Sequence, residues 1–375
     1  MVEVAARRAW AEVDLAAIRH NASLLAGRAA PASLCAVVKA AAYGHGSVAV
    51  ARAALEGGAS WLAVAIVEEG AVLRGHHIDA PILLLSEPVV ESMDDVVALR
   101  LTPTLYTERG VEAAAKAVAS AGASPLDVHV KVDTGMHRVG AGAEEALAVV
   151  QAIADRPELN FGGLWTHFAV ADEPGNPFTD EQCRRFDDVV RRLPVRPRLV
   201  HASNSAGVLA HPGARHDMVR CGIALYGVAP SPALAAVQPV DGLRPALSLR
   251  ARVSYVRDVA AGEAVSYGLR RPLGRAARVA TVPVGYADGV PWRLGVEGGD
   301  VLIGGRRRPL AGSVTMDQIM VDCGDDAGVL PGDEVVLIGR QGAEQVTAWE
   351  WATKVGTIAY EVLCGIGPRV PKVYG

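Results

Sequence analysis

The chain has 375 residues, of which 50% are hydrophobic and 21% charged, and its net charge is −4. This length favours two domains, or one barrel with an appended domain, and the composition can bury a large core. The lack of a basic block argues against nucleic acid or an anionic membrane as a partner, and no apolar run approaches the roughly 18 residues of a membrane span. Five scattered cysteines, and an N-terminus without the layout of a signal peptide, predict a cytoplasmic protein with reduced thiols.

Short apolar segments alternate with helix-like segments from Trp10 to about Asp241. We expect strands at 34–39, 61–65, 82–86, 101–106, 127–132, 161–167, 198–202 and 217–221. The Ala-, Leu-, Glu- and Arg-rich segments between them predict helices at 46–57, 66–75, 107–121, 142–155 and 179–192. Eight strands that alternate with helices predict a parallel (β/α)8 barrel over 10–242, in which functional residues gather at the carboxyl ends of the strands.

The pattern changes after Gly242, where short strand-like segments are separated by Gly or Pro turns. These segments are 246–256, 277–282, 300–303, 318–322 and 333–338. Helical periodicity almost disappears there. We therefore expect a mostly antiparallel β domain over 243–375, with residues 1–9 as a candidate part of it.

The most informative segment is an apolar run that ends at Lys39 and is followed by Tyr43-Gly44-His45-Gly46. A lysine at a strand end is a candidate for amine chemistry, because partial burial lowers its pKa and frees the amine for Schiff-base formation. Read alone, however, the segment favours a lysine that simply extends to solvent.

Other polar residues follow the later predicted strands, and a barrel would bring them to the same mouth. They are Lys131, Asp133, Arg138, His167, His201, Asn204, Ser205 and Arg220. Loops after strands seven and eight often bind phosphate, and the Ser205 hydroxyl could do so together with the N–H groups of Gly222 and Ile223. With Lys39, this suggests pyridoxal 5′-phosphate. Taken singly, His167 reads as a core histidine and the arginines as capping or ion-pairing groups. Because a barrel would bring all of these residues to the same mouth, we favour a functional site over separate structural roles. The pair His76-His77 has no spaced companions, so no metal site is expected.

Ordered motifs run nearly from end to end of the chain. They are 36–39 with 43–46, 131–138, 165–168, 201–205, 219–227, 265–268, 285–289, 316–318 and 360–364. In this order and spacing they resemble the motifs of the alanine racemases, enzymes with a pyridoxal-phosphate barrel and a C-terminal β domain.

The resemblance implies that Lys39 holds the cofactor as an aldimine and acts with Tyr267 as one of two bases. His167 and Arg220 would support the tyrosine, and Arg220 would also contact the pyridine nitrogen. Because a guanidinium cannot accept a proton, that nitrogen would stay unprotonated and transamination would be disfavoured.

Further roles follow from the same resemblance. Phosphate contacts would come from Tyr43, Ser205, Gly222, Ile223 and Tyr360. Arg138 would bind the substrate carboxylate and the phenolate oxygen of the cofactor, and the backbone amide of Met316 would bind substrate. Lys131 is a candidate for carbamylation, which would fix Arg138.

The activity implied is the interconversion of L- and D-alanine by two-base proton transfer, which would supply D-alanine for peptidoglycan. The substrate would be a small amino acid. Tyr267 and Met316 would reach the cofactor of the other subunit in a head-to-tail homodimer, so that each site is shared. Without the resemblance, Tyr267 could equally be an ordinary strand aromatic and Met316 a core residue.

Four positions depart from the family pattern. Ala41 stands where Asp or Asn is usual, Ser313 and Thr315 stand where Arg and often Cys are expected, and Trp292 replaces an arginine of the access corridor in some members. Lys39, Tyr267 and the phosphate residues are all present, so the departures do not change the expected reaction. They leave open the charge of the access corridor and the size of substrate that it admits.

Three alternatives stay open at this point. A racemase of broader specificity would act on serine or another amino acid. A barrel decarboxylase of related fold would need an acidic partner for the pyridine nitrogen, where Arg220 stands instead. A cofactor-binding carrier without turnover would lack the second domain that contains Tyr267.

Overall fold

The computed structural model describes residues 8–238 and 240–375, which form two compact units. The barrel unit comprises 16–42 and 47–244 without residue 239, and the sheet unit comprises 8–15, 43–46 and 245–375. Within the described residues, no helix has both the length and the apolar character that a membrane crossing requires.

The barrel unit contains eight parallel strands in two sets of four. The sets have the orders β4-β3-β2-β9 and β5-β6-β7-β8. Most of their residues are buried, as expected for parallel strands covered by helices. The strands are β2 (Ser33–Val37), β3 (Trp61–Val64), β4 (Ile82–Leu84), β5 (Thr104–Leu105), β6 (Leu126–Lys131), β7 (Leu159–Trp165), β8 (Leu199–His201) and β9 (Met218–Cys221).

Backbone hydrogen bonds join the two sets and close the barrel. At one seam Leu84 donates to the carbonyl of Thr102 at 2.9 Å, and at the other Arg220 donates to the carbonyl of Ser203 at 2.9 Å. The last strand, β9, also pairs with the first, β2. The predicted (β/α)8 barrel is therefore confirmed, and the carboxyl ends of all eight strands face the same mouth.

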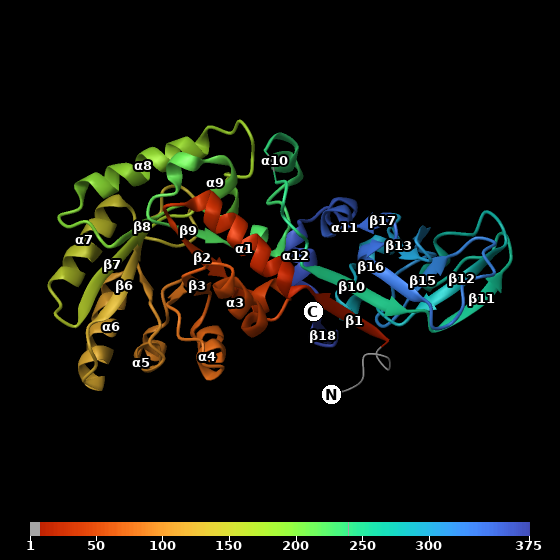
Figure 1. Cartoon of the computed structure of the whole chain (residues 1–375), viewed down its shortest axis with the longest axis horizontal. Helices are drawn as coiled ribbons and strands as arrows, with labels where there is room; N and C mark the ends of the chain where they lie inside the picture. The colour runs from red at the N-terminus through yellow and green to blue at the C-terminus, as the bar shows by residue number, and fades with distance from the viewer. Residues whose placement is uncertain (1–7, 239) are drawn as a thin grey trace. The chain divides into compact units, whose positions relative to one another are not determined.

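Helices connect the strands and lie outside them (Figure 1). The five predicted helices correspond to α3 (Ser47–Glu56), α4 (Val67–Gly75), α6 (Glu108–Ala121), α7 (Ala143–Ala154) and α8 (Phe178–Arg192). Thr107 illustrates a local start signal, since its hydroxyl accepts the N–H of Gly110 and caps α6. The sequence did not predict α1 (Leu15–Ala29), α5 (Met93–Ala98), α9 (Ser205–Ala210) or α10 (Pro232–Val237).

The strand predicted over 34–39 ends two residues early, because the backbone turns left-handed after Lys39. α2 (Lys39–Tyr43) has positive φ at Ala40, Ala41, Ala42 and Tyr43, between 50° and 54°. Ala42 donates to the carbonyl of Val38 at 2.9 Å and closes the turn. For L-residues this conformation costs about 1–2 kcal/mol each, so the surrounding structure must hold the turn.

The sheet unit is mostly antiparallel, as predicted, and contains two sheets. The larger has the order β14-β13-β16-β10-β1-β18 with β17 on β16, and the smaller is β11-β12-β15. The elements are β1 (Ala9–Val13), β10 (Leu247–Arg252), β11 (Tyr255–Val259), β12 (Ala277–Val282), β13 (Asp300–Ile303), β14 (Arg306–Pro309), β15 (Ile319–Asp322), β16 (Glu334–Gln341), β17 (Glu344–Val346) and β18 (Lys372–Tyr374), with the unpredicted helices α11 (Ala348–Val355) and α12 (Ala359–Cys364).

The start of the chain differs from the expectation that the barrel begins at Trp10. β1 pairs antiparallel with β10 and parallel with β18, so it lies in the larger sheet of the sheet unit. Trp10, Ala11 and Val13 are buried there. The prediction that residues 1–9 join the β domain concerns segment 1–7 chiefly, which lies outside the described residues. The domain boundaries themselves stay a prediction.

The left-handed turn predicts the effect of substitutions at Ala41, whose side chain is exposed. Asn and Gly tolerate positive φ better than Ala, whereas a β-branched residue tolerates it worse. We expect Ala41→Asn and Ala41→Gly each to raise the free energy of unfolding by about 0.5–1 kcal/mol, and Ala41→Val to lower it by at least as much. Urea denaturation measures the three changes. Equal stability of the Asn and Val variants would contradict the left-handed backbone.

Candidate functional site

The carboxyl ends of the barrel strands bring together most of the polar residues singled out in the sequence. Lys39 follows β2, Lys131 ends β6, His167 follows β7, and Arg220 lies in β9. Ser205 begins α9, directly after the segment that follows β8. Because parallel strands place their carboxyl ends at one mouth, these side chains share a location although they come from distant parts of the chain.

Arg220 is the most heavily bonded of these residues and is 2% exposed. Its guanidinium donates to the carbonyl oxygens of Thr166 at 2.7 Å and Ala202 at 2.8 Å, and to Nδ1 of His201 at 2.7 Å. A longer contact of 3.3 Å reaches Nδ1 of His167. All these partners are neutral. Among the residues that the structure describes, Arg220 forms no ion pair with a carboxylate, which leaves a buried positive charge without an anionic partner.

The contacts of Arg220 set the tautomers of the neighbouring histidines. Because arginine only donates, Nδ1 of His201 accepts and the ring hydrogen lies on Nε2, which donates to Nδ1 of His129 at 3.0 Å. By the same logic His167 carries its hydrogen on Nε2. Burial lowers the pKa of all three imidazoles, to about 3 for His129 and well below the ordinary value for His167 and His201. The histidines are therefore neutral.

The indole of Trp165 lies against two buried cations. Lys131 Nζ is 4.4 Å from the ring centroid and the guanidinium carbon of Arg220 is 4.5 Å away. The imidazole of His201 stacks on the same indole at 5.7 Å and 7°. An aromatic face attracts cations through its quadrupole, so Trp165 stabilises both side chains and partly offsets the lack of a carboxylate partner at Arg220.

Positive charge accumulates at this mouth. Burial lowers the pKa of Lys131 to about 7, and the Arg220, Arg138 and Lys39 cations act in the same direction. Burial likewise lowers the pKa of Arg220, to about 10. Four basic side chains thus act on one another, and Asp133 is the acidic group that opposes them at Lys131. A site of this kind is suited to an anionic ligand.

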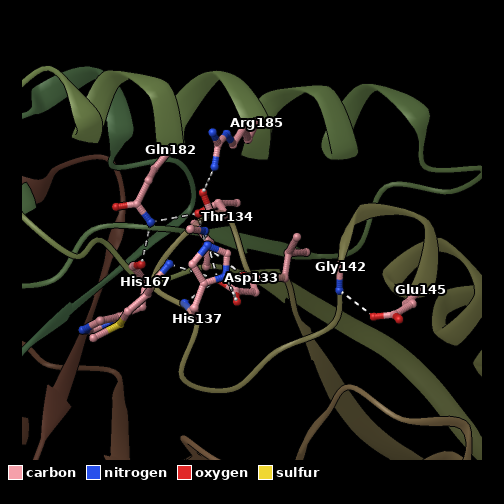
Figure 2. Close-up of polar contacts among 12 residues, drawn as sticks. Asp133, Thr134, His137, Gly142, Glu145, His167, Gln182 and Arg185 are labelled. Atoms are coloured by element: carbon pink, nitrogen blue, oxygen red, sulfur yellow. Dashed lines mark hydrogen bonds and ion pairs between the residues drawn. The ribbon is translucent and has the colours of Figure 1, made fainter.

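The loop after β6 is shaped by Asp133 (Figure 2). Its Oδ1 accepts the N–H groups of Gly135, Met136 and His137 at 2.9–3.1 Å, and its Oδ2 contacts the imidazole of His137 at 3.2 Å. Burial acts to raise the pKa of Asp133, but these donors outweigh it and the pKa lies below its ordinary value. The turn places the exposed Arg138 beside the mouth.

A second network ties the loops after β6 and β7 to helix α8 (Figure 2). Gln182 donates to Thr134 Oγ1 at 3.0 Å and to the carbonyl of His167 at 3.1 Å, and it accepts the N–H of Ala169 at 2.8 Å. Thr166 donates to the carbonyl of Val132 at 2.9 Å, so the Thr134 hydroxyl donates to Thr166 at 2.8 Å. Buried and fully bonded, Gln182 fixes the backbone on which His167 stands.

The hydroxyl and amides predicted to bind phosphate meet after β8 and β9. Ser205 Oγ accepts the N–H groups of Gly222 at 3.0 Å and Ala224 at 3.3 Å. The side chain of Asn204 caps α9 by accepting from Gly207 at 3.0 Å. This group is a concentration of donors at the end of the barrel. Ile223 is buried beside it.

Tyr43 and Tyr360 belong to the sheet unit, where their ring centroids lie 6.1 Å apart. Gly44 allows the close approach of this segment to α12, because at φ +82° a Cβ would lie 2.5 Å from the carbonyl oxygen of Leu363. Burial raises the pKa of Tyr43 far above its ordinary value, so it is a neutral hydroxyl.

Tyr267 and Met316 also lie in the sheet unit, on its surface. Tyr267 is 76% exposed and Met316 52%. A hollow of about 630 Å³ adjoins Tyr267 and is lined in part by Thr315. Ser313, where an arginine is expected, donates its hydroxyl to the carbonyl of Tyr267 at 3.0 Å, and Ser266 donates to the carbonyl of Ser313 at 2.7 Å. The departure at 313 thus anchors the backbone of Tyr267.

Three residues of the site were missed in the sequence. Gln182 could have been identified from helical spacing, because it lies on the same face of α8 as Phe186 and Val189. That face is buried, and a polar residue is unexpected there. His129 is a polar residue in an apolar strand, and Gly163 makes room for it, because a Cβ at 163 would lie 2.6 Å from its ring. Glu69, which accepts the N–H groups of Ala40 and Ala65, could not have been identified, because the sequence does not distinguish its role from that of the adjacent Glu68.

Comparison with known proteins places the chain among enzymes of one kind. Residues 13–230 match the family model "Alanine racemase, N-terminal domain" and residues 246–374 match "Alanine racemase, C-terminal domain". The alanine racemase of Symbiobacterium thermophilum is 47% identical over 372 residues, which cover 98% of this chain and 97% of that protein.

Solved structures agree with this assignment. The alanine racemase of Bacillus anthracis, crystallised with bound L-Ala-P, aligns with a TM-score of 0.91 at 38% identity, covering 98% of this chain and 95% of that one. A histidine racemase from Leuconostoc mesenteroides aligns with the same TM-score at 29% identity, covering 99% and 98%. The fold is therefore shared by racemases named for different amino acids.

The lowered pKa of Lys131 predicts a pH-dependent contribution to stability. Between pH 7 and 10.5 the unfolded chain binds a proton at Lys131 that the folded protein does not bind, so stability rises with pH across this window. Lys131→Met removes the buried charge. We expect its gain in unfolding free energy to be largest at pH 6–7, on the order of 3 kcal/mol, and to shrink toward pH 10.

Urea denaturation in CO₂-free buffer measures this effect. Lys116→Met is the matched control, since Lys116 is exposed on α6 and its replacement should show no such pH trend. A gain for Lys131→Met that is independent of pH would contradict the assignment.

Proposed function

The chain belongs to the alanine racemase family, and we propose on that premise that it interconverts L-alanine and D-alanine with pyridoxal 5′-phosphate as cofactor. The observation that carries the proposal is the buried Arg220, which has no carboxylate partner among the described residues and stands at a barrel mouth with Lys39, Lys131 and Arg138. An anionic cofactor with an unprotonated ring nitrogen satisfies such a site.

The donor set fits this cofactor group by group. Lys39 offers an amine for covalent attachment, and the Ser205 hydroxyl and the Ile223 amide would donate to the phosphate, joined by the Gly222 amide if it exchanges its bond to Ser205 Oγ for one to the phosphate. Tyr43 and Tyr360 would add phenolic donors from the sheet unit. Lys39 would hold the cofactor until the substrate amine takes its place; the cofactor would then withdraw electrons from the α-carbon of the substrate, and the released Lys39 amine would be free to exchange the α-proton.

Arg220 limits what that electron withdrawal can do. A guanidinium donates a hydrogen bond without transferring its proton, so a ring nitrogen held by Arg220 would remain unprotonated. The His201 and carbonyl contacts hold the guanidinium in place for this role. An acidic partner at this position, as a decarboxylase of related fold needs, is replaced by a cation. The arrangement favours proton exchange over transamination or decarboxylation.

Racemisation needs one proton-transfer group on each face of a planar α-carbon. We assign the Nζ of Lys39 to one face and the Oη of Tyr267 to the other. A phenol with a pKa near 10 must be stabilised as its anion to act at neutral pH. His167, neutral with hydrogen on Nε2, is a donor suited to that purpose, and Arg220 behind it adds positive charge.

A second copy of the chain would complete the site. Tyr267 and Met316 are exposed on the sheet unit, as is Leu269 at 65%. On the monomer Tyr267 is exposed to water, whereas a partner would bring His167 and Arg220 of its barrel mouth to the phenol and favour the anion. We therefore propose a head-to-tail homodimer, in which Tyr267 and the amide of Met316 serve the cofactor on the Lys39 of the partner. Each monomer then contributes half of each site.

We assign substrate selection to Arg138 and to the charge around Trp292, the departure in the access corridor. Arg138 is an exposed cation beside the mouth and would pair with the α-carboxylate. Trp292, 45% exposed, lies under the guanidinium of Arg270 at 5.7 Å, so a cation remains close to the position of the missing corridor arginine. Family membership further implies a cytoplasmic location and a supply of D-alanine for peptidoglycan.

Lys131 is the residue that we propose to be carbamylated. At a pKa of about 7 a large fraction of its amine is neutral near physiological pH, as attack on CO₂ requires. The amine forms an N–C bond with CO₂ and releases one proton, which turns a cation into an anion beside Arg138 and Arg220. The modification would supply the carboxylate that these arginines lack.

The reaction itself is tested by incubating the protein with pyridoxal phosphate and single L-amino acids, followed by chiral chromatography. We expect D-alanine to form at least about tenfold faster than any other D-amino acid, as membership of the alanine racemase family implies. Faster D-serine or D-histidine would assign a broader or different racemase. Absence of every D-product while the cofactor absorbance is present would contradict the proposed activity.

Shared sites predict complementation between two inactive variants. Lys39→Ala and Tyr267→Phe should each lower racemisation by about 10³-fold or more, because each removes one proton-transfer group. In a mixture refolded together, half of the dimers contain one chain of each kind, and one of their two sites is intact. We expect about one quarter of the wild-type activity to return.

Tyr255→Phe is the control for the tyrosine, since Tyr255 is 52% exposed on β11 and should tolerate the change. A mixture that stays inactive while sedimentation shows mixed dimers would contradict a shared site.

Carbamylation predicts a labelled carbonyl signal. After exchange with ¹³C-bicarbonate, we expect one carbamate resonance in the NMR spectrum of the wild-type protein and none in Lys131→Met. The reason is that Lys131 is the lysine of the site whose buried amine we expect to react with CO₂. A spectrum without the resonance at alkaline pH would overturn the modification and leave the racemase assignment untouched.

A further inference from the structure

Glu69 holds two backbone N–H groups at the ends of neighbouring barrel strands. Its Oε1 accepts from Ala40 at 2.5 Å, and its Oε2 accepts from Ala65 at 2.8 Å. β2 ends at Val37 and β3 at Val64, so neither N–H belongs to a strand ladder. Glu69 lies in the first turn of α4, the helix that follows β3. One carboxylate therefore ties the start of α4 to the carboxyl ends of both strands.

The contact at Ala40 falls within the left-handed turn, where local preference opposes the observed backbone. Ala40 has φ 51° and ψ 52°, a conformation that an alanine rarely adopts. A turn of this kind persists only where neighbouring groups determine it. The bond from Ala42 to the carbonyl of Val38 closes the turn from within, and the bond to Glu69 fixes its first amide from outside.

Lys39 stands between two fixed amides. On one side the N–H of Val38 donates to the carbonyl of Ala63 at 2.8 Å, and on the other the N–H of Ala40 donates to Glu69. The direction of the lysine side chain depends on the backbone at residues 38–40, because the Cα–Cβ bond is set by φ and ψ. The restraint on Ala40 is thus a restraint on where the amine of Lys39 points.

We propose that Glu69 is a positioning residue for Lys39, whose carboxylate holds the left-handed turn and so aims the amine at the cofactor and the α-carbon. The inference rests on the proposed function in that Lys39 is the cofactor lysine. Glu69 itself contacts two backbone amides and acts on the reaction only through the position of Lys39.

Replacement of the Glu69 carboxylate by an amide tests the two hydrogen bonds selectively. Glutamine keeps the size of the side chain but has one acceptor oxygen, so Glu69→Gln can satisfy only one of the two N–H groups. Glu69→Ala removes both bonds. Glu68→Gln is the matched control, because it makes the same charge change in the same turn of α4, on an exposed side chain with no polar partner among the described residues.

Two readouts on the full-length protein test the proposal. The first is hydrogen exchange at the Ala40 and Ala65 amides without cofactor, measured by NMR. We expect exchange at least about tenfold faster at both amides in Glu69→Ala, and at one or both in Glu69→Gln, with no change in Glu68→Gln. The second is the dissociation rate of the bound cofactor together with kcat and KM for alanine.

For the second readout we expect cofactor dissociation to be about tenfold faster and kcat to fall by a similar factor, with KM within about twofold of wild type. A purely structural role would lower stability without this split. Wild-type exchange rates at both amides in Glu69→Ala would overturn the proposal. It would also be overturned if Glu69→Ala showed faster exchange but lost cofactor no faster than Glu68→Gln and had the same kcat. If the wild-type protein neither retains pyridoxal phosphate nor racemises alanine, the proposed function fails, while the exchange measurement still decides whether Glu69 holds the turn.

Discussion

The buried guanidinium of Arg220 is the interaction on which the site depends. Its donors determine the tautomers of His201 and His167 and hold the carbonyls that follow β7 and β8. Its charge helps to keep Lys131 partly neutral and the histidines uncharged. A buried cation among neutral acceptors is unfavourable unless an anion lies close by. The arrangement around Arg220 is therefore what supports the proposal of an anionic cofactor and of a carbamate at Lys131.

Strain and restraint occur together beside the reactive lysine. Four residues after Lys39 adopt positive φ, and the carboxylate of Glu69 with the carbonyl of Val38 holds them there. The turn also gives a physical meaning to the departure at Ala41, since Asn and Asp are the non-glycine residues that best accept this conformation. At Ser313 the departure has a different consequence, because the hydroxyl bonds the backbone of Tyr267. Both departures thus act on the backbone that holds Lys39 or Tyr267 and leave those two residues unchanged.

Much of the barrel and little of the polar support was predictable from the sequence. The positions of Lys39, Lys131 and Arg220 at or near the carboxyl ends of strands follow from apolar runs that reach a charged residue, and parallel topology then brings them to one mouth. The short helices α5, α9, α11 and α12 lack a long periodic pattern, so packing rather than local propensity forms them. No strand was predicted at β1, and the barrel was expected to begin at Trp10; pairing with β10 and β18 across more than 230 residues places this segment in the sheet unit instead.

The sequence by itself determined the family and with it the class of chemistry: an apolar run that ends at Lys39, polar residues after the later strands, and motifs in the order and spacing of the alanine racemases. Composition and motif order determine these because residue type sets what a side chain can donate, accept or attack. Tertiary structure alone decided the left-handed turn, the partnership of Glu69 with Ala40 and Ala65, the His129–His201–Arg220 chain and the lowered pKa of Lys131. Each of these depends on which groups meet across distant segments and on how far water is excluded, and neither quantity is contained in local sequence.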